Sequence, residues 1–229
     1  MRRFVTEAVG GLMVSQGKAG QAYQQIEQLI VSETLSPGTL VSEAVLMEKT
    51  GLGRTPVREA LQQLARDRMV EIHPNRGVLI PPASVEAELR MLEVRRVLEA
   101  LAVRLACHNA TVDDRARMEA LMRRLSGDPM PLTQYAQTLK DIHGLVACAG
   151  NNEYLADAMA PLQGLSRRFW LAHLRDAPRE IRRGSGHYLA ILGAILARDP
   201  GAAEQSSLAL NDYLVEFAYA SIRRPPALP

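Results

Sequence analysis

The stretch Leu52-Gly53-Arg54-Thr55-Pro56-Val57-Arg58-Glu59-Ala60-Leu61-Gln62-Gln63-Leu64 decides the fold of the N-terminal part of this 229-residue chain. Its apolar residues recur at i, i+3, i+4 and i+7, which predicts a helix with one buried stripe. We expect Thr55 to cap this helix and Pro56 to take its first position, where an N–H has no helical partner. The outward face of the first turns carries Arg54, Thr55, Arg58, Glu59 and Gln62. Such a helix suits the major groove of DNA.

Two upstream segments complete a helix-turn-helix. Residues 21–33 have apolar side chains at helical spacing and lead into the breaker Ser36-Pro37-Gly38. Ser42 is then predicted to cap a short helix that ends near Lys49, and Gly51 follows where a left-handed residue closes a helix. Two short helices joined by a glycine-containing turn form the motif.

Downstream, two β-prone runs, residues 70–73 and 78–80, flank the turn Pro74-Asn75-Arg76-Gly77. They predict a hairpin that forms a wing, with an arginine at its tip. The sequence therefore predicts a winged helix-turn-helix over residues 20–81. Residues 1–19 are expected to be a flexible arm.

These residues resemble the DNA-binding domain of GntR-type bacterial repressors. The resemblance rests on Pro37-Gly38, on R-T-P-V-R-E-A-L at 54–61, and on P-N-R-G at 74–77. It implies a DNA-binding surface of Arg54 and Arg58 for phosphates and bases, Thr55 for the backbone, Arg76 or Gly77 for the minor groove, and Glu59, Gln62 and Asn75 beside them. The family usually has Ser where Gly53 stands, and often Arg where Ala44 stands. Because phosphate contacts supply much of the affinity, we expect weaker non-specific binding.

Composition gives no independent argument for DNA. Residues 20–80 hold six basic and seven acidic side chains, so any positive field must come from the placement of single arginines. The whole chain has a net charge of +2 and 2 cysteines, which suggests no disulfide framework and fits a cytoplasmic protein. The longest apolar run, residues 189–197, is too short for a membrane span, so we expect no membrane partner.

After Pro81-Pro82 the chain has almost no strand signal, and helical patterns follow one another. The predicted helices span about residues 84–109, 111–125, 132–149, 153–175, 178–198 and 200–222. Six helices with short connections predict an antiparallel bundle over residues 82–224. The fold class is therefore mainly α, with a winged helix-turn-helix followed by an all-helical bundle.

The bundle resembles the effector domain of the FadR/FCD branch. The resemblance rests on E-V-R-R-V-L-E at 93–99, on His143 with Asn152 nine residues later, and on Ala194-Ile195 ahead of Asp199. In that branch an aspartate and three histidines often hold a divalent metal, which binds a small carboxylic acid together with an arginine. Here one of the four positions keeps its ligand, and the four residues are Leu139, His143, Tyr188 and Leu210. We therefore expect no metal and no other cofactor.

The predicted effector-binding residues are Arg95, His143, Asn152, His187 and Tyr188. Arg95 needs a carboxylate if it is buried, and either Glu99, four residues on, or a bound acid would supply it. Asn152 has a second role open to it, as the cap of the next helix.

The sequence therefore predicts a ligand-responsive transcriptional regulator that is not an enzyme. Its expected partners are a double-stranded DNA operator, a small organic acid and a second copy of the chain. Repressor activity is implied by the resemblance alone. Two alternatives stay open. One is a DNA-binding dimer whose bundle is filled by Leu139 and Leu210; the other is a metal-dependent helical enzyme built on His143, His173 and His187.

Overall fold

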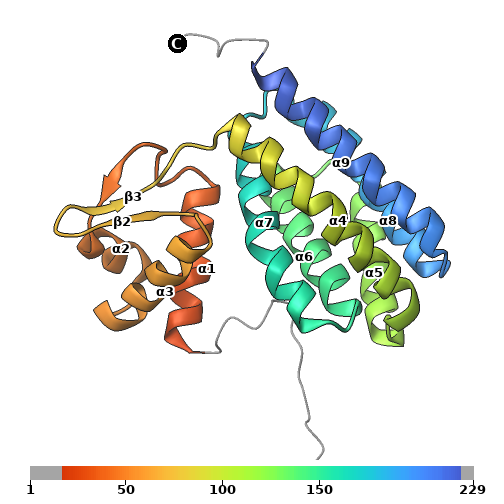
Figure 1. The fold of residues 1–229 in the computed structure, drawn as a ribbon, viewed down its shortest axis with the longest axis horizontal. Coiled ribbons are helices and arrows are strands. Elements are labelled where there is room, and N and C mark those ends of the chain that lie inside the picture. Colours follow the sequence, from red (N-terminus) through yellow and green to blue (C-terminus); the bar gives the residue numbers. More distant parts are fainter. Residues whose placement is uncertain (1–16, 223–229) are drawn as a thin grey trace, which may run out of the picture.

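The computed structural model describes residues 17–222 and divides them into two bodies that lie side by side (Figure 1). The smaller body consists of α1 (Lys18–Val31), β1 (Leu40–Val41), α2 (Glu43–Thr50), α3 (Arg54–Arg66), β2 (Glu71–His73) and β3 (Gly77–Leu79). Most of the predicted arm lies outside the described residues, but the helix predicted from Gln21 already begins at Lys18. The predicted fold class, a winged helix-turn-helix followed by a helical bundle, is confirmed.

The start of α3 differs from the prediction. Gly53 is the N-cap, and Arg54, Thr55 and Pro56 already belong to the helix. The backbone of Gly53 is extended, with φ −73° and ψ 171°, and no side chain caps the helix. The prediction that Thr55 is the cap was therefore wrong by two residues. The apolar stripe was right, because Val57, Ala60, Leu61 and Leu64 are all buried.

The turn before α3 follows its local signals. The hydroxyl of Ser42 accepts a hydrogen bond from the backbone N–H of Val45 at 3.3 Å and so caps α2. Gly51 ends α2 with φ +66°, the left-handed conformation that glycine adopts without strain. The angle between α2 and α3 is therefore set by one capping serine and one glycine.

The wing is part of a three-stranded antiparallel sheet in the order β1-β3-β2. The predicted hairpin is present, with Ile72 opposite Val78 and His73 opposite Gly77. The strand β1, which pairs Leu40 with Leu79, was not predicted. This third strand joins the wing to the segment that enters α2.

The larger body is a bundle of six helices among the described residues. They are α4 (Val85–Asn109), α5 (Val112–Ser126), α6 (Leu132–Ala149), α7 (Glu153–Ala172), α8 (Ala177–Leu196) and α9 (Pro200–Ile222). α4 runs beside α9 along one side of the bundle and also packs on α7 (Figure 1). The core of the bundle includes the fully buried Leu92, Met118, Ile142 and Leu192. None of the helices in residues 17–222 is long and apolar enough to cross a membrane.

Two apolar residues of the bundle are more exposed than the helical pattern predicts. Val97 on α4 keeps 69% of its surface exposed, and Val112 at the start of α5 keeps 72%. The rotation of each helix about its axis turns these two side chains to the surface. Cys148 is also exposed, whereas Cys107 is buried.

Candidate functional site

The surface predicted to read DNA is accessible on α3. Arg54, Thr55, Arg58 and Gln62 are all exposed. The Nε of Arg58 donates to both carboxylate oxygens of Glu43 on α2, each at 2.9 Å. The Arg58 side chain is still 61% exposed, so this ion pair leaves most of the guanidinium open to a further partner.

Glu59 stands apart from the other predicted DNA-binding residues. It is exposed, but it borders a cleft of about 1220 Å³ between α3 and α1 on one side and α5, α6 and α7 on the other. Gln63 and Arg66 border the same cleft. One flank of α3 therefore faces the helical bundle, while Arg54 and Arg58 are not among the residues that line this cleft.

The wing presents Asn75 and Arg76 at an exposed turn. The backbone N–H of Arg76 donates to the carbonyl of His73 at 3.1 Å, and Asn75 has φ +61°. Gly77 has φ +117°, and a Cβ atom there would lie 2.8 Å from the carbonyl oxygen of Val41. Gly77 is therefore required by the close approach of β3 to the end of β1, whatever its contact with DNA.

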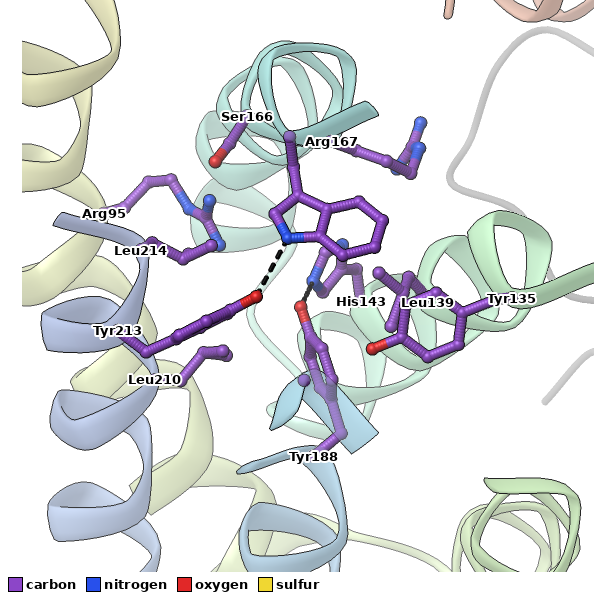
Figure 2. A pocket seen from close by; sticks show the side chains of 12 residues that line it. Arg95, Tyr135, Leu139, His143, Ser166, Arg167, Tyr188, Leu210, Tyr213 and Leu214 are labelled. Atoms are coloured by element: carbon purple, nitrogen blue, oxygen red, sulfur yellow. Dashed lines mark hydrogen bonds between the residues drawn. The ribbon is translucent and has the colours of Figure 1, made fainter. Parts of the chain in front are cut away.

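A second site lies inside the bundle, where α4, α6, α7, α8 and α9 meet around a cavity of about 20 Å³ (Figure 2). Three of the predicted effector-binding residues line this cavity, namely Arg95, His143 and Tyr188. Leu139 and Leu210 also line it. The volume is enough for about one water molecule. As it stands, the cavity is too small for an organic acid.

Arg95 is almost fully buried, and its side chain is paired within its own helix. Its Nε and one terminal nitrogen donate to Oε1 of Glu99 at 3.1 and 2.6 Å. The amide of Gln163 also donates to that oxygen, at 3.5 Å. Burial lowers the pKa of Arg95, but Glu99, Tyr188 and Glu88 together outweigh this effect, and the pKa is raised above its ordinary value. Of the two partners considered for Arg95, the structure contains the protein carboxylate.

His143 and Tyr188 share a buried hydrogen bond of 2.8 Å between Nε2 and the phenol oxygen. Burial, followed by the charges of Arg95 and Arg167, holds the pKa of His143 well below its ordinary value, so the imidazole is neutral at pH 7. Burial raises the pKa of the Tyr188 hydroxyl, which is neutral as well. The Nδ1 atom of His143 has no hydrogen-bond partner within the described part of the chain.

Asn152 and His187 do not reach the cavity. Oδ1 of Asn152 accepts from the backbone N–H of Leu155 at 3.1 Å, so Asn152 caps α7. His187 stacks on Tyr213, with ring centroids 5.2 Å apart, whereas its sequence neighbour Tyr188 is buried and lines the cavity. The rotation of about 100° per residue separates these neighbours on α8.

Other residues of the cavity were not predicted from the sequence. Trp170 and Tyr213 are joined across it by a hydrogen bond of 3.0 Å (Figure 2). The remaining unpredicted lining residues are Tyr135, Ser166, Arg167, Gly184 and Leu214. A signal for Arg167 was present, because the pair Arg167-Arg168 interrupts an apolar stretch of α7. Both of these arginines are buried.

The donor set of the cavity does not fit a divalent metal. Of the four positions that hold ligands in the resembling branch, His143 alone carries a usual ligand atom, and its Nε2 already bonds Tyr188. Asp141, two positions before His143, does not line the cavity, and it accepts a hydrogen bond from the side-chain amide of Gln137 at 2.8 Å. Across residues 17–222, no three His, Cys, Asp or Glu side chains come together in a group that could hold a metal ion.

Arg167 also joins the bundle to the winged helix. One terminal nitrogen of Arg167 donates to Oε1 of Glu27 on α1 at 2.8 Å, and Lys140 on α6 donates to Oε2 at 2.6 Å. Beside this pair, a Cβ atom on Gly164 would lie 2.8 Å from the end of the Met69 side chain. The two bodies therefore meet through a buried carboxylate and a glycine of α7.

Two family models match the chain. Residues 18–80 match the family described as bacterial regulatory proteins, gntR family, and residues 90–212 match the FCD domain. The second match alone covers more than half of the chain. The two matched segments fall on the winged helix and on the bundle.

Individual proteins agree with these matches. An HTH-type transcriptional regulator of Agrobacterium vitis, from the TAR-I ttuE-ttuC' intergenic region, is 36% identical over 52% of this chain and 69% of its own length. The galactonate operon transcriptional repressor of Escherichia coli is 22% identical over 80% of this chain and 89% of its own. The solved structure of E. coli McbR/YncC is 20% identical, covers 91% of this chain and 100% of its own, and has a TM-score of 0.72. That structural likeness supports the fold.

Proposed function

The chain belongs to the GntR family of bacterial regulatory proteins, in the branch with an FCD domain, and from this premise we propose that it represses transcription in response to a small organic acid. That it is a DNA-binding transcriptional regulator follows from the family. The identity of the effector class, the homodimer, the sign of regulation and a cytoplasmic location are parts of the proposal. We place it in the cytoplasm because its DNA partner lies there. We assign it no enzymatic activity.

The DNA-binding part of the proposal is carried by the exposed arginine face of α3. Arg54 and Arg58 lie on its first turns, where a recognition helix contacts base edges and phosphates. Arg76 stands at the tip of the wing, next to the sheet that positions it. We propose that these three arginines make the local positive field that the overall charge of the domain does not provide.

The sensing part of the proposal is carried by one observation, the set of buried polar groups around the cavity. Arg95, Arg167 and His143 approach it from three helices, and Nδ1 of His143 has no hydrogen-bond partner among residues 17–222. Buried polar atoms are seldom left unpaired without a ligand, a water or a functional reason. A carboxylate among these groups would pair with guanidinium and find further donors. Of the relatives, one is named as a repressor of a galactonate operon, and galactonate is a small organic acid.

The cavity would have to expand to admit an acid. Leu139, Leu210 and the ring of Trp170 form much of its wall. We propose that ligand binding selects a more open arrangement of the bundle, which requires the acid to have unequal affinity for the two arrangements. The small cavity equally favours a second candidate function, a DNA-binding dimer whose bundle is filled and binds no ligand.

A homodimer is the expected form for reading two half-sites. Val94 and Val97 on α4 are exposed apolar residues one turn apart, at 50% and 69%. We propose that this side of α4 contributes to the contact between two copies.

Two measurements test the proposal. Repeated selection of bound duplexes from random DNA should enrich a pseudo-palindromic sequence; failure to enrich any sequence would contradict operator recognition. Thermal unfolding in the presence of malate, citrate, D-galactonate or benzoate should show a raised midpoint with at least one acid. If no acid raises the midpoint while DNA is still bound, the second candidate, the filled dimer, is the better account.

A further inference from the structure

Arg167 is the residue that links the cavity to the DNA-binding domain. It lines the cavity, and its guanidinium is paired with Glu27 of α1, 140 positions away in sequence. Figure 2 shows the Arg167 side chain leaving α7 on the side opposite Arg95. The side chains of Arg167 and Glu27 are only 6% and 8% exposed. A buried ion pair of this kind therefore stands between the two bodies of the molecule.

The two arginines of the cavity are paired with carboxylates from different bodies of the molecule. Arg95 is paired with Glu99, which lies on the same helix of the bundle. Arg167 is paired with Glu27, which lies in the winged helix. A ligand that formed an ion pair with Arg95 would disturb only the bundle. A ligand that formed an ion pair with Arg167 would also change how the DNA-binding domain is attached.

The cavity and the interdomain cleft share a wall. His143 and Arg167 line both of them. An anion in the cleft therefore meets the Arg167 side chain before it meets Arg95 or Tyr188, neither of which lines the cleft. Movement of Arg167 would open the cavity toward the cleft and break the pair with Glu27 in one step.

Both charges would keep a partner in that step. Glu27 would retain Lys140, whose Nζ lies 2.6 Å from Oε2 and which is partly exposed in the cleft. Arg167 would gain the carboxylate of the ligand, to which a guanidinium can donate two parallel hydrogen bonds. This matters because a buried charge left without a partner strongly opposes any rearrangement.

We propose that the Glu27–Arg167 ion pair is a latch, which an organic anion opens by taking Arg167 from Glu27, so that the winged helix is released from α7. This inference rests on the proposed sensing of an acid. It adds which residue carries the signal and where the ligand enters. In the released state the winged helices of a dimer would no longer be held at one fixed placement, and affinity for paired half-sites would fall.

The test measures the distance between the two bodies in the full chain. Cys148 is replaced by Ser, and spin labels are attached to cysteines that replace Glu48 on α2 and Arg123 on α5, both of which are exposed. Glu27→Gln, without ligand, is expected to shift the distance distribution to longer and broader values. Lys140→Gln is the matched control, because it removes the other partner of Glu27 but leaves the pair with Arg167. Its distribution should match that of the unmodified protein.

Arg167→Gln is a second variant that breaks the same pair from the other side, and it should reproduce the shift seen with Glu27→Gln. Circular dichroism identifies any variant that fails to fold. If the folded Glu27→Gln and Arg167→Gln proteins both keep the original distance distribution, the latch is overturned. If Lys140→Gln shifts the distribution as much as they do, Arg167 has no special role and the proposal is also overturned.

Binding of the acid is followed separately from the distance, using fluorescence of Trp170, the single tryptophan of the chain, which lines the cavity. Malate, citrate, D-galactonate and benzoate are the probes. An acid that changes the fluorescence should move the unmodified protein to the distribution of Glu27→Gln, and should move that variant no further. An acid that changes the fluorescence without changing the distance contradicts the latch and leaves the sensing intact. No fluorescence response to any probe contradicts the sensing and the opening by ligand, while the Glu27→Gln distances still decide whether the pair holds the two bodies together.

Discussion

Arg58 of the recognition helix α3 is held by Glu43 of α2, with its Nε at 2.9 Å from both carboxylate oxygens. The pair joins the two helices of the helix-turn-helix across 15 positions of sequence. Since both side chains are accessible to solvent, the pair adds little stability, and it is better understood as orienting Arg58. On binding DNA, Arg58 would then turn from this carboxylate to a phosphate or a base edge, or bind both.

Replacement of Arg58 by Ala should weaken binding to the selected operator by about 1–3 kcal/mol, the range for a specific arginine contact. Replacement of Glu43 by Gln should instead strengthen operator binding at low salt, since it removes a negative charge next to the DNA. Gel-shift titration measures both, and Arg90→Ala, an exposed arginine of α4 paired with Glu86, is the control. Equal affinity of Arg58→Ala and the unmodified protein would exclude Arg58 from the interface.

Replacement of Gly77 by Ala should destabilise the wing. The residue has φ +117°, and the added Cβ would meet the carbonyl oxygen of Val41 at 2.8 Å. Backbone strain of this kind costs on the order of 1–3 kcal/mol. Urea unfolding followed by circular dichroism should show the loss, and DNA affinity should fall with it. Arg76→Ala should lower DNA affinity without changing stability. A Gly77→Ala protein with unchanged stability would contradict this account of the wing.

Removal of Arg95 should leave Glu99 as an unpaired buried charge. Arg95→Met is expected to lower the free energy of unfolding by about 3–5 kcal/mol, as when one partner of a buried pair is lost. The double variant Arg95→Met/Glu99→Met should recover most of that loss, because no charge then remains unpaired. Denaturant unfolding of the four proteins of this cycle gives the coupling directly. If the double variant were less stable than Arg95→Met, the pair would not explain the burial of Arg95.

The stability of the protein should depend on the titration of His143. Its pKa in the folded state lies well below the ordinary value of about 6.5, so below that pH the unfolded chain takes up a proton that the folded chain does not. Stability is therefore lost as the pH falls from about 6.5, by up to about 1.4 kcal/mol per pH unit. The pKa of His187 is also lowered, so the comparison is with His143→Gln, which keeps His187. The difference in unfolding free energy between the two proteins should shrink as the pH falls from 7 to 5.5; a constant difference would show that His143 titrates normally.

A charge placed on the exposed side of α4 should disrupt the dimer. Val97→Glu is expected to shift the protein toward the monomer in sedimentation velocity, because the contact would bury that carboxylate. Val112→Glu is the matched control, since Val112 is equally exposed but lies at the start of α5. A dimer that withstands Val97→Glu would place the contact between copies elsewhere.

Features with a local cause could be predicted from the sequence. Ser42 and Asn152 cap helices as their residue types suggested, and Ser84 and Thr111, where two predicted helices begin, are caps as well. The α3 cap was misplaced because Thr55 is a good capping residue by type, whereas Gly53 takes the position through its backbone alone. The strand β1 is only two residues long and is defined by its pairing with β3, so no run of β-prone residues predicts it.

Features of the site that depend on distant contacts were less predictable. His143 and Tyr188 were expected near each other from the family pattern, and they meet across 45 positions. The role of Arg167 depends on Glu27 from the other body and on the exact packing of α7 against α1, which no spacing in the sequence expresses. His187 was misplaced because one residue of helical rotation separates a cavity residue from a neighbouring face.

The most direct test of the central claim compares two duplexes. Fluorescence anisotropy would follow the binding of the full chain to the duplex enriched by selection and to a scrambled duplex of the same composition, at one fixed salt concentration. The account predicts that the selected duplex binds at least about 10³-fold more tightly, and that Arg58→Ala removes much of this ratio. Equal affinity for the two duplexes, or none for either, would contradict it.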